Sequence, residues 1–75
     1  MDINISRLKE TVILKNTTME SLAYDMGVDR STLYRKLKKG SSGITLRDAM
    51  NIAKSLNLSE AETDSIFGGY HVPRV

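Results

Sequence analysis

Residues 30–39 form the segment of this sequence best suited to bind another molecule. The segment contains five basic side chains and no acid: Arg30, Arg35, Lys36, Lys38 and Lys39. Residues 59–69, by contrast, contain three acids and no base. A cationic patch on one element and an acidic patch on another indicate a polyanionic partner that binds in one orientation. On charge alone, a solvated helix face with ordinary lysines explains the segment equally well.

The length and composition of the chain argue against several function classes. A chain of 75 residues forms one domain and has no room for an enclosed catalytic cleft beside its core. It has no cysteine, and its single histidine, His71, has no partner for a metal site. No apolar run reaches the roughly 20 residues that span a bilayer, and the polar N-terminus is unlike a signal peptide. We therefore expect a cytoplasmic, non-enzymatic protein without metal, cofactor, small-molecule ligand or membrane partner.

Apolar residues at helical spacing predict that the elements carrying these charges are helices. A first helix begins near Asp2 or Asn4 and ends at Asn16, which tolerates a left-handed conformation. A second helix is capped by Thr17 or Thr18, and Thr17 has capping-box spacing to Glu20. The residues expected to face inward are Ile5, Leu8, Val12 and Ile13 in the first helix, and Met19, Leu22, Ala23 and Met26 in the second.

A sharp turn is expected between the second helix and the third, which spans residues 30–38. Gly27 supplies a positive φ angle, and Asp29 caps the third helix. Because only residues 27–29 separate the second helix from the third, the third helix must cross the second at a sharp angle. Leu33 and Leu37 lie one turn apart on the inward face, so that Ser31, Arg35 and Lys39 lie roughly opposite.

Two more helices complete an expected compact five-helix fold. Thr45 and Asp48 have capping-box-like spacing, as have Ser59 and Glu62. The fourth helix is expected to bury Leu46, Ala49, Met50, Ala53 and Leu56, and the fifth Ile66 and Phe67. Residues 1–69 are expected to form the domain, and residues 70–75 a C-terminal tail.

Residues 17–58 resemble the Cro/repressor-type helix-turn-helix family, which has the lambda-repressor-like fold. The matching residues are Thr18, Glu20, Leu22-Ala23, Gly27-Val28, Ser31-Thr32-Leu33, Gly40 and Ile52 to Leu58. Two residues depart from the pattern: Met19 stands where glutamine is usual, and Lys36 where an apolar residue is usual. Residues 30–37 also resemble the DNA-reading helix of Fis-like activators.

The resemblance implies binding in the major groove of double-stranded DNA, and residue chemistry suggests how. Arginine binds guanine through two hydrogen bonds, and serine bonds to any base, whereas lysines contact phosphates. We expect base contacts from Arg30, Ser31, Arg35 and Tyr34, although Tyr34 could instead contact phosphate or pack at the edge of the core. We expect phosphate contacts from Thr18, Lys36, Lys38, Lys39 and Ser41.

A homodimer is expected on an operator, because one module covers only about 600–1,000 Å² of DNA contact. Phe67, Tyr70 and Val72 are the candidate partner surface, unless Phe67 belongs to the core. The family resemblance implies a phage Cro-like repressor that acts by occupying its operator. The alternatives are a protein–protein adaptor or antitoxin on the same fold, and a Fis-like architectural DNA binder.

Overall fold

Five α-helices and one short 3₁₀ helix follow one another in the computed structural model, which describes residues 3–68. They are α1 (Ile5–Leu14), α2 (Met19–Asp25), α3 (Arg30–Lys38), η1 (Gly40–Ser42), α4 (Leu46–Ser55) and α5 (Glu60–Phe67). No strand occurs among the described residues, so the expected all-α fold is confirmed. None of these helices is long and apolar enough to cross a membrane.

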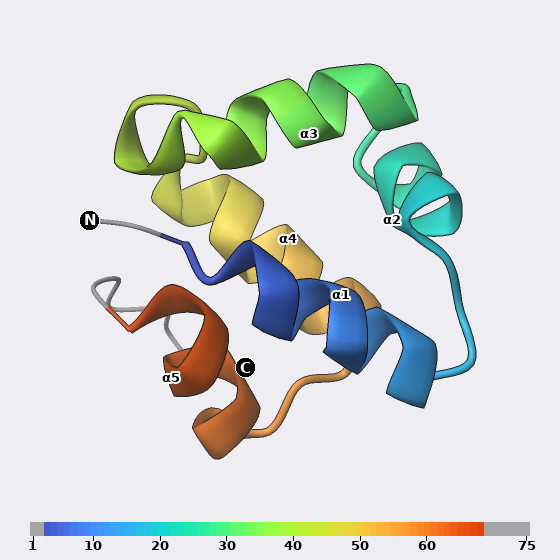
Figure 1. The fold of residues 1–75 in the computed structure, drawn as a ribbon, viewed down its shortest axis with the longest axis vertical. Helices are drawn as coiled ribbons and strands as arrows, with labels where there is room; N and C mark the ends of the chain where they lie inside the picture. The colour runs from blue at the N-terminus through green and yellow to red at the C-terminus, as the bar shows by residue number, and fades with distance from the viewer. Residues whose placement is uncertain (1–2, 69–75) are drawn as a thin grey trace.

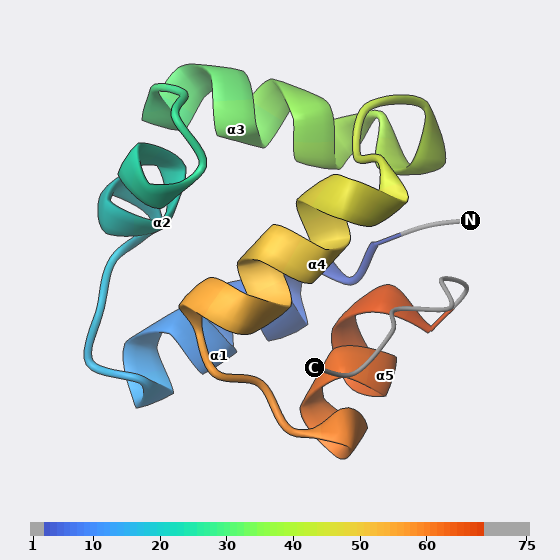
Figure 2. The same cartoon turned by 180° about the vertical axis from the view of Figure 1, so that it is seen from behind.

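The helices are arranged so that α3 lies along one side of the molecule. Figures 1 and 2 show α3 at the top of both views and α5 at the bottom, with α1 and α4 between them. Helix α2 packs against α3 and α4, and α1 packs against α5. The basic third helix and the acidic fifth helix therefore lie on opposite sides of the fold.

Side chains that accept hydrogen bonds from backbone amides begin the helices. Asp29 Oδ1 accepts from the amide of Thr32 at 2.7 Å, which starts α3. Thr18, and not Thr17, caps α2, because its hydroxyl accepts from the amide of Ser21 at 3.0 Å. The expected capping box at Thr17 is therefore wrong, whereas the boxes that begin α4 and α5 are both formed.

The turn between α2 and α3 has the geometry expected from its glycine. Gly27 has a φ angle of 73°, and the amide of Val28 donates to the carbonyl oxygen of Ala23 at 3.0 Å. Ala23 is buried between the elements, where a larger side chain would push them apart. The Ser55 hydroxyl donates to Asp25 at 2.6 Å and so ties α2 to α4.

The core lies beneath α3, and two expectations about it need correction. Ile13 is 72% exposed, because it lies about 120° around α1 from the buried stripe of Leu8 and Val12. Leu46 is 44% exposed, and the unpredicted Ile52 is fully buried in α4. The buried apolar residues are Ile3, Leu8, Val12, Met19, Leu22, Ala23, Leu33, Leu37, Ile44, Ala49, Ile52, Leu56, Ile66 and Phe67.

Candidate nucleic-acid interface

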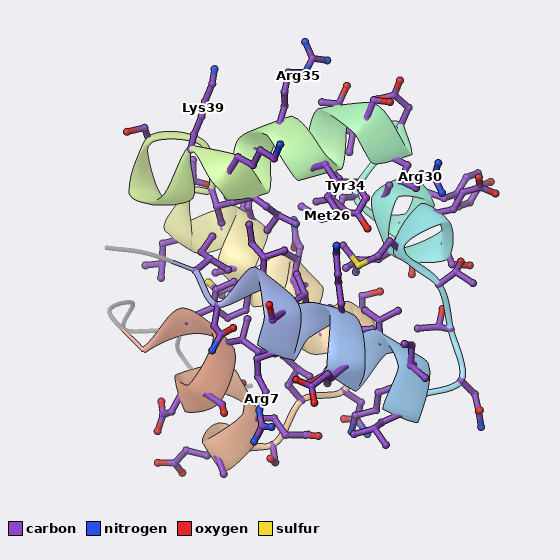
Figure 3. The ribbon with its side chains drawn as sticks, in the orientation of Figure 1. Arg7, Met26, Arg30, Tyr34, Arg35 and Lys39 are labelled. Atoms are coloured by element: carbon purple, nitrogen blue, oxygen red, sulfur yellow. The ribbon has the colours of Figure 1, made fainter. Side chains whose placement is uncertain are left out.

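The outer face of α3 is held in place by the two leucines on its inner face. Leu33 is fully buried and Leu37 almost so. Opposite them, Ser31, Arg35, Lys38 and Lys39 are exposed. Figure 3 shows Arg35 and Lys39 projecting outward from α3, away from the rest of the molecule. No segment of the described chain covers this face, so it can enter a groove.

Arg35 is oriented by its neighbours one turn earlier on α3. Its Nη2 donates to the hydroxyl oxygen of Thr32 at 3.3 Å. Hydrogen bonds from Thr32 to Asp29, with help from the positive charge of Arg35, hold the pKa of the Asp29 carboxyl below its usual value. Asp29, Thr32 and Arg35 thus form a short row of hydrogen-bonded polar residues along α3.

Arg30 and Tyr34 lie on a different flank of α3. Five residues at about 100° each place Arg30 about 140° around the helix from Arg35, and Figure 3 shows the two arginines pointing in different directions. Tyr34 is half-buried against the core, and its ring lies 5.3 Å from the Lys9 ammonium of α1. Of the roles considered for Tyr34, the structure favours packing at the edge of the core, away from the face that carries Arg35.

Lys36 forms an ion pair with another side chain of the protein. Its Nζ lies 3.2 Å from Asp48 Oδ2, and both side chains are partly buried. Partial burial raises the pKa of Asp48, but the Thr45 amide and the Lys36 ammonium outweigh this effect and hold that pKa below its usual value. Lys36 therefore joins α3 to the start of α4, and a phosphate contact from Lys36 would have to compete with this ion pair.

Three of the other residues expected to contact phosphate are exposed to solvent. Lys38 and Lys39 are exposed at the C-terminal end of α3. Thr18 is exposed, and its hydroxyl oxygen accepts the capping bond while its proton stays available to a partner. The side chain of Ser41 lies outside the described part of the structure.

A family model for the Cro/C1-type HTH DNA-binding domain matches residues 7–62. The chain belongs to this family. The comparisons with curated proteins and with solved structures found no match. Membership makes this Cro/C1-type chain a helix-turn-helix DNA-binding domain of the kind used in transcription regulation, with double-stranded DNA as its partner.

The two departures from the family pattern have structural consequences in this Cro/C1-type domain. Met19 is buried at the start of α2, where it packs into the core. Lys36 stands outside the core and pairs with Asp48, and Leu37 takes the buried position.

The expected dimer surface is corrected at one residue. Phe67 is fully buried in the core and offers no area to a partner. Tyr70 and Val72 lie outside the described residues. Within residues 3–68, no group of histidine, aspartate or glutamate side chains is placed to hold a metal ion.

Two residues of this region were not predicted from the sequence to take part in the interface. Lys9 lies beside Tyr34, and Thr32 lies beside Arg35. The i, i+3 spacing of Thr32 and Arg35 could have indicated their contact. No local pattern could have indicated Lys9, because its position depends on how α1 packs against α3.

Proposed function

We propose that this Cro/C1-type protein recognises a specific operator in double-stranded DNA and represses transcription by occupying it. The observation that carries the proposal is the exposed outer face of α3, whose polar and basic side chains stand opposite the buried Leu33 and Leu37. A helix presented in this way fits the major groove, where base edges carry a distinct pattern of donors and acceptors.

Base contacts are assigned to Arg35, Ser31 and Arg30. Arg35 and Ser31 belong to the outer face, and Arg35 suits the O6 and N7 acceptors of guanine. Arg30 points another way, but it lies in the first turn, the end of a recognition helix that contacts base edges. Its role at bases therefore stays in the proposal.

Phosphate contacts are assigned to Lys38, Lys39, Thr18 and Ser41. The two lysines lie in the last turn of α3 and just beyond it, where they can hold the backbone at the edge of the groove. Such contacts position the domain without specifying the sequence. The acidic α5 lies on the opposite side of the molecule, which supports α3 as the side that faces DNA.

The operator is expected to be bound by two copies, whose recognition helices enter half-sites about one helical turn apart. Tyr70 and Val72 remain candidates for the surface between the copies. The domain is proposed to span residues 1–69 and to act in the cytoplasm. The resemblance to short Cro-like regulators supports a phage lysis–lysogeny switch as its setting.

Selection of binding sites from a pool of random DNA duplexes tests this proposal. We expect enrichment of one sequence with two-fold symmetry and half-sites about one helical turn apart. Retention of all duplexes without an enriched sequence would instead favour an architectural binder. Absence of any DNA retention at low salt would favour a protein–protein module.

A further inference from the structure

The ion pair between Lys36 and Asp48 occupies one of the positive charges of the basic third helix. Among residues 3–68, the other four basic side chains of residues 30–39 are exposed and form no ion pair. We propose that Asp48 withholds Lys36 from the DNA backbone and thereby limits the affinity of α3 for DNA of any sequence. This inference rests on the function proposed above, because it requires α3 to face DNA.

Lys36 lies close enough to the outer face of α3 to reach DNA once it is released. At about 100° per residue, it stands about 100° around the helix from Arg35, and it is the neighbour of Lys39 one turn later. Its side chain is 31% exposed, so part of it already reaches solvent. A lysine has a flexible four-carbon stem and can extend its ammonium toward a phosphate at the edge of the groove.

The carboxylate of Asp48 is ordered independently of Lys36. Its Oδ2 accepts from the amide of Thr45 at 3.1 Å, and the amide of Asp48 donates to the Thr45 hydroxyl oxygen at 3.1 Å. Figures 1 and 2 both show the start of α4 beneath the C-terminal half of α3, which brings this capping box to Lys36. Only the lysine loses conformational freedom when the pair forms, so the pair costs less entropy than one between two mobile side chains.

The pair is expected to affect the strength of DNA binding and not the choice of bases. Each phosphate neutralised by a protein cation releases counterions, so each such contact makes the affinity more dependent on salt. While Lys36 is bound to Asp48, it contributes no contact of this kind. Its release would add one contact on every DNA sequence, because phosphates carry no sequence information.

Asp48→Asn tests the inference, because the amide keeps an oxygen that can accept from the Thr45 amide but has no charge to hold Lys36. Affinity for a random-sequence duplex is measured by fluorescence anisotropy between about 50 and about 200 mM salt. The slope of log affinity against log salt should steepen by about 0.9, the value for one added phosphate contact. The gain in affinity over the wild type should therefore be about three- to fourfold larger at the lower salt concentration.

Lys36→Met distinguishes the release of Lys36 from the mere loss of a negative charge. In the Lys36→Met background, Asp48→Asn has no ammonium to release, so the double variant should keep a slope near that of the wild type. Lys36→Met alone should also keep it. Asp64→Asn makes the same change in net charge on α5, on the opposite side of the molecule, and should match the wild type.

An unchanged slope for Asp48→Asn would overturn the inference, and so would an equal steepening with and without Lys36→Met. A shallower slope for Lys36→Met alone would also overturn it, because Lys36 would then already bind phosphate in the wild type. Circular dichroism melting establishes that the variants are folded. If Asp48→Asn does not fold, Asp48→Gln replaces it with the same expected slope, since glutamine is a usual capping-box residue at this position.

The failure of this inference can be distinguished from the failure of the proposed function. If the wild type binds duplex DNA and Lys38→Ala lowers the slope while Asp48→Asn leaves it unchanged, only this inference fails. If the wild type binds no duplex, the proposed function itself fails.

Discussion

The guanidinium of Arg35 is held by the hydroxyl of Thr32, with Nη2 3.3 Å from Oγ1. Both residues lie on α3, and the amide of Thr32 is in turn bound by the Asp29 cap. The bond that starts the helix and the bond that orients its central arginine therefore meet in one residue. If Arg35 contacts a base as proposed, Thr32 can affect that contact without touching DNA itself.

Replacement Thr32→Val should weaken specific binding and spare nonspecific binding. Valine keeps the shape and the backbone amide that caps α3, but it removes the acceptor for Arg35. The affinity for the selected operator should fall by about 2–10-fold, the usual value of one hydrogen bond, while the affinity for random DNA stays the same. Thr32→Ser, which keeps the hydroxyl, should bind the operator like the wild type. Wild-type operator affinity in Thr32→Val would show that Arg35 needs no such support.

Lys38 and Lys36 should behave differently although both are lysines of α3. Lys38→Ala should lower the salt slope by about one for every sequence, because an exposed phosphate contact is lost. Lys36→Ala should leave the slope near the wild-type value and instead lower the melting temperature, because Asp48 loses its partner. Fluorescence anisotropy at several salt concentrations measures the slopes. Equal changes of slope in the two variants would contradict the assignment of Lys36 to the fold.

The free energy of unfolding should depend on pH because of the Asp48 carboxylate. The folded-state pKa of Asp48 lies below the ordinary aspartate value of 3.8, so its contribution to the free energy of unfolding is present above that pH. The contribution is lost as the pH falls through the lower folded-state pKa. Asp48→Asn should melt about 4–8 °C below the wild type near neutral pH, if the acid contributes about 1 kcal/mol. The difference should shrink as the pH falls below the ordinary pKa of an aspartate and the carboxylate takes up a proton. Asp64→Asn is the control and should track the wild type, since Asp64 is exposed; a constant difference for Asp48→Asn would contradict the ionic role.

Gly43 should not tolerate a side chain, for a reason unrelated to its φ angle. A Cβ atom at Gly43 would lie 2.3 Å from the carbonyl oxygen of Lys36 and 2.9 Å from its Cα. Both atoms belong to the backbone of α3 and cannot turn aside. Gly43→Ala should therefore cost about 1–3 kcal/mol of unfolding free energy in urea titrations. Ser42→Ala, at the exposed neighbouring position, should stay within about 0.5 kcal/mol of the wild type. Wild-type stability of Gly43→Ala would show that the loop packs less closely on α3.

Local patterns in the sequence were sufficient to predict how the helices begin and turn. Asp29, Thr45 and Ser59 all cap helices, because a cap is determined by the two residues, three apart, that share a hydrogen bond. Gly27 has the expected positive φ angle, as has Asn16. The outward placement of Arg35 followed from the spacing of Leu33 and Leu37.

Contacts between distant segments could not be predicted in this way. The pairing of Lys36 with Asp48 and the approach of Gly43 to α3 depend on how α4 returns beneath α3. The complete burial of Phe67 depends on the packing of α5 against α1. The Lys36–Asp48 ion pair uses one of the five basic side chains within the fold, which a count of charges over residues 30–39 could not indicate.

The central claim is that the outer face of α3 recognises base sequence, and Arg35→Ala tests it most directly. Affinities of the wild type and the variant are measured for the selected operator and for random DNA under the same salt conditions. We predict a loss of about 1–3 kcal/mol on the operator and a much smaller loss on random DNA. An equal loss on both would contradict the claim, because Arg35 would then contact only the backbone.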